Sequence, residues 1–211
     1  MGNLLSPEGT VMQFITKLVY SVYLNILWFI CCIPIVTVGA STTALFYVSL
    51  KIVKNEEGNI TKSFFYSFKE NFKQGTVIWM ILLIIGIILG LDGYILYRLH
   101  FSNAFWTIIT AVFLVAVVGY AIVLMYIFPL LSRFSNTTLA MFKNSLFIGM
   151  RFLLCTFFMA VIYFIMLYIV INIMTPAVIF GMGTCALFCS YLLTNILAMC
   201  EEKTNNSESQ I

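Results

Sequence analysis

The chain has 211 residues, of which 62% are hydrophobic and only 9% are charged, and its formal net charge is +3. A soluble domain carries about 25% charged residues and must expose part of its surface to water, so this composition excludes an ordinary soluble fold. The small net charge gives no reason to expect a nucleic-acid partner. We therefore expect an integral membrane protein surrounded by the lipid bilayer.

The first apolar run, 11–33, is long enough to cross about 30 Å of hydrocarbon as a helix. It contains Lys17, whose long side chain can extend to an interface. No basic residue precedes the run, so it does not look like a cleaved signal peptide. Pro34 should end this helix.

The second run, 35–53, contains the small residues "GASTTA", which allow helix backbones to approach closely inside a bundle. We expect a full crossing here, and a re-entrant hairpin is the alternative.

Four further apolar runs follow, at 76–97, 104–130, 152–174 and 177–199. A backbone in lipid must satisfy its own hydrogen bonds, so each run is expected to be helical. The sequence thus predicts an all-α fold, a polytopic transmembrane helix bundle. It has six helices, or five plus the re-entrant hairpin, in a single domain over 1–200. The polar residues 201–211 are expected to form a disordered cytoplasmic tail.

Basic residues predict the orientation of these crossings. The loop 51–75 contains five lysines and the loop 131–151 contains three basic residues, whereas the connection 98–103 contains one. Basic residues accumulate on the cytoplasmic side of membrane proteins. Both large loops are therefore expected in the cytoplasm, and six crossings would place both termini there.

The loop segment at about 61–73 predicts an amphipathic helix. At 3.6 residues per turn, aromatic side chains fall on one face and lysines on the opposite face, a pattern typical of a helix in a membrane interface. Its lysines suit the anionic inner leaflet. The alternative is that the aromatic residues pack under the bundle. The candidate interface residues are Lys62, Phe64, Phe65, Phe68, Lys69, Phe72 and Lys73.

Polar residues inside apolar runs are candidates for function. Asp92 is the only acid within a crossing, and it lies near Arg98 and His100 at the expected outer face. It could form a cation or proton site or line an outward pocket, or it could be an interfacial carboxylate paired locally, for instance with Arg98. Asn25 and Asn172 are further candidates, although such amides commonly bridge helices.

The sequence lacks the common catalytic and metal-binding motifs. The chain has no GxxxxGK[ST], HExxH, GxSxG or zinc-ligand spacing, and one histidine with one deep acid gives few acid–base pairs. Cys185 and Cys189 are one helical turn apart, but small apolar residues are the simpler interpretation. We therefore expect no enzyme, no cofactor and no bound metal.

Several stretches carry a family resemblance: "YLNILWF", "GASTTALFYVSLKI", "FFYSFKENFKQGT" and "FPLLSRF", in this order. Over roughly 10–200 the chain resembles the YesL family of bacterial membrane proteins, classed under a domain of unknown function. The resemblance implies the bacterial cytoplasmic membrane and an accessory role in carbohydrate use, because such proteins are often encoded beside sugar-uptake ABC transporters. It implies no catalytic residues.

Two functions follow from these observations. The first is a non-catalytic membrane protein that binds a partner, such as an ABC-type sugar permease, or associates with itself. The alternative is a small-molecule transporter or channel, because the proline break at 33–35 resembles broken helices that line substrate sites. An enzyme would need a ligand pocket around Asp92, Arg98 and His100.

Overall fold

The structure is a computed structural model that describes residues 10–56, 58–98, 104–172 and 178–208. His100 lies outside these residues. Within them the chain forms α-helices and one short 3-10 helix, and no strand. The elements are α1 (Thr10–Cys32), η1 (Ile35–Thr37), α2 (Val38–Val53), α3 (Ile60–Glu70), α4 (Phe72–Arg98), α5 (Ala104–Leu131), α6 (Thr138–Arg151), α7 (Leu153–Asn172) and α8 (Val178–Glu208).

Six segments are long and apolar enough to cross a membrane, which confirms the predicted class of fold. They include the run 35–53, for which a re-entrant hairpin was the alternative. There η1 and α2 continue in one direction from Ile35 to Val53 without a hairpin. The six segments are Val11–Cys32, Ile35–Val53, Phe72–Arg98, Trp106–Leu131, Leu153–Asn172 and Gly181–Met199.

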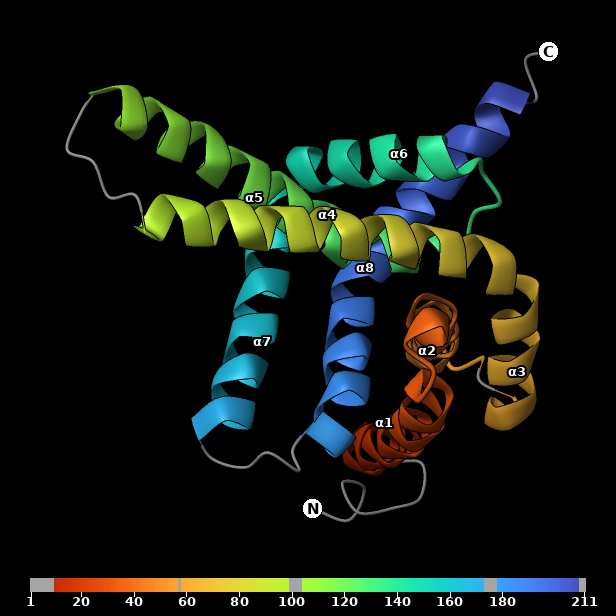
Figure 1. Ribbon diagram of the computed structural model, residues 1–211. Helices are drawn as coiled ribbons and strands as arrows, with labels where there is room; N and C mark the ends of the chain where they lie inside the picture. The colour runs from red at the N-terminus through yellow and green to blue at the C-terminus, as the bar shows by residue number, and fades with distance from the viewer. Residues whose placement is uncertain (1–9, 57, 99–103, 173–177, 209–211) are drawn as a thin grey trace.

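Helix α2 is the most buried of the spans, and α1, α3, α4, α5 and α8 contact it; it lies between α8 and α3 in Figure 1. In the most apolar part of each span, 67% of the α2 residues are buried, against 17% in α4 and 6% in α5. The small residues "GASTTA" explain this position, because short side chains let several backbones approach one helix. The hydroxyls of Thr42 and Thr43 donate to the carbonyls of Val38 and Gly39, so they need no water.

Glycine makes the closest helix crossings possible. A Cβ on Gly39 of α2 would collide with the carbonyl oxygen of Gly75 on α4 and lie 2.7 Å from Cβ of Trp79. A Cβ on Gly183 of α8 would collide with the carbonyl oxygen of Ser21 on α1. These contacts fix α4 and α1 against the rest of the core, and no larger residue fits them.

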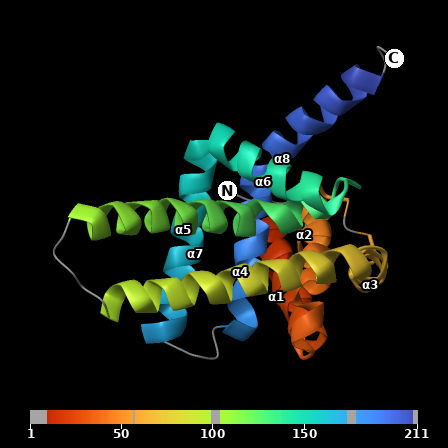
Figure 2. The same ribbon diagram turned by 45° about the horizontal axis from the view of Figure 1, so that its top comes forward.

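Helices α4 and α5 form a hairpin that lies across α7 and α8 (Figures 1 and 2). The end of α4 that carries Gly75, Ile78 and Leu82 is buried, and so is the end of α5 near Tyr126. The other ends extend away from the α2-centred core, and their apolar side chains are exposed. The spans are therefore not all parallel, and the hairpin presents apolar surface on most sides.

Three parts differ from the sequence-based boundaries. The interfacial helix predicted at 61–73 ends at Glu70, because the chain turns at Asn71 and Phe72 already begins α4. Helix α6, at Thr138–Arg151, was not predicted. Helix α8 continues to Glu208 and so includes 201–208, which was expected to be a disordered tail. Helical backbone bonds need no apolar side chains, so a helix can extend beyond the apolar run.

Candidate functional site

The two basic loops lie at the same end of the molecule. The side-chain amide of Gln74 donates to the carbonyl oxygen of Asn136, with the two atoms 2.6 Å apart. This bond joins the start of α4 to the loop before α6, 62 positions later. The arrangement agrees with the expectation that both loops face one side of the membrane.

Helix α3 divides its aromatic residues between the core and the surface. Phe64 is fully buried, and its ring stacks 6.4 Å from that of Phe68. Phe65 of α3 and Phe72, the first residue of α4, are each 40% exposed. The three candidate interface lysines, Lys62, Lys69 and Lys73, are all exposed. The two interpretations of this helix thus apply to different residues: Phe64 packs on the bundle, whereas Phe65 and Phe72 remain available to a membrane interface.

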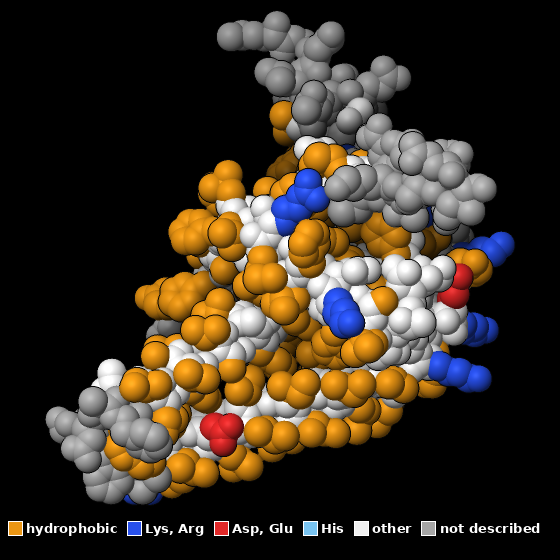
Figure 3. Space-filling model, turned by 90° about the horizontal axis from the view of Figure 1, so that it is seen from above, with side chains coloured by type: hydrophobic (Ala, Val, Ile, Leu, Met, Phe, Trp, Pro, Cys, Tyr) orange, Lys and Arg blue, Asp and Glu red, His pale blue; other side chains and the backbone are white. Residues whose placement is uncertain are grey.

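The outer candidates do not form a pocket in the described part of the chain. Asp92 is exposed on the hairpin, and in Figure 3 an acidic group stands among apolar side chains along it. Arg98 Nε donates to the hydroxyl of Tyr94 at 3.0 Å, and the guanidinium lies 5.4 Å from that ring's centroid. The contact that Arg98 makes is therefore with Tyr94 rather than with Asp92.

The two candidate asparagines have different surroundings. Asn25 is fully buried, and its side-chain oxygen accepts a hydrogen bond from the backbone N–H of Gly183 at 2.9 Å. Asn172 is exposed and donates to the carbonyl oxygen of Tyr168 in its own helix at 3.1 Å. Asn25 thus bridges α1 and α8, whereas Asp92 lies on the α4–α5 hairpin. The structure does not bring these candidate residues together.

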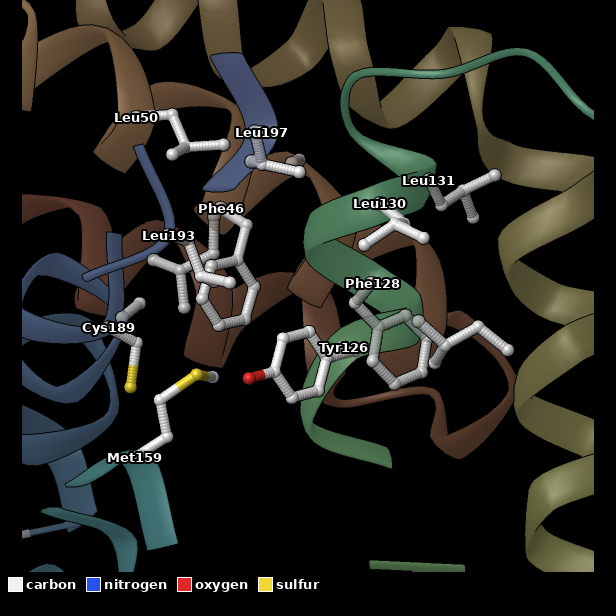
Figure 4. Packing of buried hydrophobic residues seen from close by; sticks show 14 of the residues in the cluster. Phe46, Leu50, Tyr126, Phe128, Leu130, Leu131, Met159, Cys189, Leu193 and Leu197 are labelled. Carbon is white, nitrogen blue, oxygen red and sulfur yellow. The ribbon is translucent and has the colours of Figure 1, made fainter. Parts of the chain in front are cut away.

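A buried hydroxyl and sulfur cluster, which the sequence analysis missed, joins α5, α6, α7 and α8 (Figure 4). The hydroxyl of Thr156 donates to the carbonyl oxygen of Gly149 at 2.8 Å, so the Tyr126 hydroxyl, 2.8 Å away, donates to Thr156. The Tyr126 hydroxyl points toward Met159, and Cys189 lies beyond Met159 (Figure 4). The described residues contain no group of three metal-ligating side chains, and this cluster holds the helices together.

Two open cavities lie on the helix surfaces. The larger has a volume of about 500 Å³ and lies between α1, α7 and α8; it is lined by Phe14, Phe158, Val161, Ile162, Phe188, Tyr191 and Leu192. The smaller, about 240 Å³, lies between α4, α5 and α6 and includes Tyr120, whose hydroxyl already donates to the carbonyl oxygen of Leu82. Both linings are apolar or aromatic, so both cavities suit hydrocarbon chains.

Comparison with known proteins relates the chain to an uncharacterised family. Residues 21–93, which include α2 and α3, match a family described as "Protein of unknown function, DUF624". The chain is also 25% identical over 151 residues to the uncharacterized protein YteU of Bacillus subtilis (strain 168). That alignment covers 69% of this chain and 66% of YteU, so it spans just under two thirds of that relative.

No solved structure matches the chain. Neither match above is described as YesL, so that resemblance stays a prediction. The matched descriptions name no substrate, partner or reaction. Sequence similarity therefore connects this multi-helix, membrane-type chain to uncharacterised bacterial proteins of the DUF624 type.

Proposed function

We propose that the chain is a non-catalytic membrane protein that binds another membrane protein through the α4–α5 hairpin. The observation that carries this proposal is that the outer half of the hairpin extends away from the other helices (Figure 2). Helix α2 is enclosed by five helices, whereas the hairpin extends away from the core with exposed side chains. A hairpin that faces only lipid does not need to extend away from the core. A hairpin that binds a partner does, because the extension leaves its side chains free to contact that partner.

Asp92 gives this hairpin a polar feature. It follows Gly75, the buried start of the α4 crossing, by 17 residues, which corresponds to about 26 Å of helix. That length is close to the thickness of a hydrocarbon layer, about 30 Å, so Asp92 lies toward the end of the α4 span that is away from the basic loops. Next to it, Gly90 has no atom within 4 Å of the place a Cβ would take. A partner helix could approach there and offer a cation or a hydrogen-bond donor to Asp92.

The expected partner comes from the resemblance to the YesL family. It suggests the membrane subunit of an ABC-type sugar permease, and hence an accessory role in carbohydrate uptake in the bacterial cytoplasmic membrane. The bond between Gln74 and Asn136 supports the proposed orientation, because it places both basic loops at one end. With six crossings, that end and both termini would be cytoplasmic.

Site-specific photo-crosslinking in native membranes tests this proposal. A photoreactive amino acid at Leu91, which is 57% exposed on the hairpin, is compared with one at Phe164, which is 70% exposed on α7. The proposal expects a permease subunit crosslinked at Leu91 and absent at Phe164, and lost when Asp92→Ala is added. Lipid adducts alone at Leu91, or a crosslink to a second copy of the chain, would contradict it.

The transporter alternative receives less support, because both described cavities have apolar linings and Tyr120 uses its hydroxyl within the fold. Flux of labelled sugars into liposomes that contain the purified chain separates the two functions. Transport by the chain alone that is lost in Tyr120→Phe would favour the transporter and overturn the partner proposal.

A further inference from the structure

The groove between α1, α7 and α8 is the larger described cavity, and it lies in one half of the membrane. Phe14 is three residues after the start of the first span at Val11, and Phe158 is five residues after the start of another at Leu153. Both of these starts follow segments expected on the cytoplasmic side. The groove therefore opens toward the inner leaflet, where the acyl chains of lipids surround it.

The lysine Lys17 borders this groove. The ammonium of Lys17 lies 5.7 Å above the ring centroid of Tyr191, which lines the groove, and 3.4 Å from the carbonyl oxygen of Val53. Val53 is the last residue of α2, so its carbonyl carries part of the negative charge of a helix C-terminus. A lysine ammonium has three donors, and this long contact occupies one of them.

Lys17 lacks a carboxylate partner among the residues that the structure describes. Placing an ammonium beside hydrocarbon is costly unless it reaches an anion or water. The aromatic and aliphatic lining contains no anion to balance this charge, whereas a phosphate at the mouth of the groove would balance it. The apolar groove and the adjacent cation together complement one kind of molecule, which has a hydrocarbon chain and an anionic headgroup.

We propose that the groove between α1, α7 and α8 is a binding site for an anionic phospholipid of the inner leaflet. One acyl chain lies against Phe14, Phe158, Phe188 and Leu192, and the headgroup phosphate accepts hydrogen bonds from Lys17. Tyr191 supports the ammonium from the other side through its ring. The site is independent of the hairpin and of its partner.

Lipid titration of the purified full chain in detergent, followed by native mass spectrometry, tests the charge. Wild type is expected to bind phosphatidylglycerol more tightly than phosphatidylcholine. Lys17→Gln should weaken phosphatidylglycerol binding about fivefold and leave phosphatidylcholine unchanged, as expected for one lysine near an anionic surface. The matched control is Lys143→Gln, which removes one exposed charge on α6. Equal effects of both variants would overturn the proposal in favour of diffuse surface charge.

A second pair of variants tests the groove itself. Val161→Trp fills the groove and should reduce binding of both lipids, whereas Ile165→Trp adds the same bulk one turn further along α7, outside the lining. An unaffected Val161→Trp protein would overturn the proposal. Inorganic phosphate in excess should not displace the lipid, and displacement by phosphate alone would reduce the site to an anion site.

Crosslinking of the unmodified chain keeps the test valid if a variant fails to fold. Vesicles that contain phosphatidylglycerol with a photoreactive acyl chain should label peptides around 158–162 and 188–192. Labelling confined to α4 and α5 would contradict the proposed position.

Discussion

Asn25 of α1 accepts a hydrogen bond from the backbone N–H of Gly183 of α8 at 2.9 Å, and so links helices 158 positions apart in the sequence. The absence of a side chain on Gly183 allows this contact, because a Cβ there would lie 3.0 Å from Cβ of Asn25. Together the two residues join α1 to α8, and both of these helices contact α2.

The first prediction concerns this bond. Asn25→Ala removes the acceptor and leaves a buried N–H without its partner, which costs about 1–3 kcal/mol. Asn172→Ala removes an exposed amide that bonds only within its own helix, so its effect should stay within about 0.5 kcal/mol. Unfolding of the detergent-purified variants measures the difference. Similar losses in both variants would show that the α1–α8 bond contributes little.

The second prediction concerns two glycines in different surroundings. A methyl group at Gly39 must displace the backbone of α4, so Gly39→Ala should destabilise the protein by about 1–3 kcal/mol. Gly90 faces open space, and Gly90→Ala should be neutral or stabilising by up to about 1 kcal/mol because alanine favours helix. Thermal denaturation of both variants checks that Gly39→Ala is the less stable of the two. A more stable Gly39→Ala protein would contradict the close α2–α4 crossing.

The third prediction separates the aromatic residues of α3. Phe64 is fully buried, so Phe64→Ala should cost about 3–5 kcal/mol. Phe65 is 40% exposed, and Phe65→Ala should cost much less stability but weaken attachment of a synthetic 58–73 peptide to anionic vesicles. Denaturation and vesicle co-sedimentation measure the two effects. If Phe65→Ala leaves the peptide bound as before, the interfacial role of α3 is wrong.

The fourth prediction concerns the Tyr126 hydroxyl. Tyr126→Phe leaves the ring in place and removes the bond to Thr156, with an expected loss of about 1 kcal/mol. The control is Tyr94→Phe, which removes a hydroxyl on the exposed hairpin that contacts Arg98. In chemical denaturation the free energy of unfolding should be lower for Tyr126→Phe than for Tyr94→Phe. The reverse order would contradict a stabilising role for the buried cluster.

The fifth prediction concerns orientation. A membrane-impermeant maleimide added to intact cells should label Tyr97→Cys, which replaces a side chain 81% exposed near the tip of the hairpin. It should label Lys143→Cys only after permeabilisation, because α6 is expected in the cytoplasm. The wild-type chain measures background from the native cysteines. Labelling of Lys143→Cys in intact cells would reverse the topology.

The sequence by itself determined the class of fold and the approximate bounds of the apolar runs, because twenty consecutive apolar residues carry a strong local signal. It left open whether 35–53 crosses fully, and the structure shows a continuous span there. It also predicted that the small residues of 39–44 would lie inside the bundle. It missed α6, although Thr137 before an amphipathic stretch resembles a helix start, because 14 residues with mixed polarity carry a weaker signal than the long apolar runs. It placed the candidate polar residues on helices without showing that Asn25 and Asp92 lie in different surroundings.

Only the tertiary structure decided which apolar faces contact protein and which remain exposed. In a membrane protein, lipid-facing and core-facing side chains are equally hydrophobic, so hydropathy cannot distinguish Leu82, which is buried, from Ile84, which is 54% exposed. The crossing of Gly39 with Gly75, the bond between Asn25 and Gly183, and the position of Lys17 over Tyr191 join segments distant in sequence. Such contacts depend on how the helices pack, and no local pattern records them.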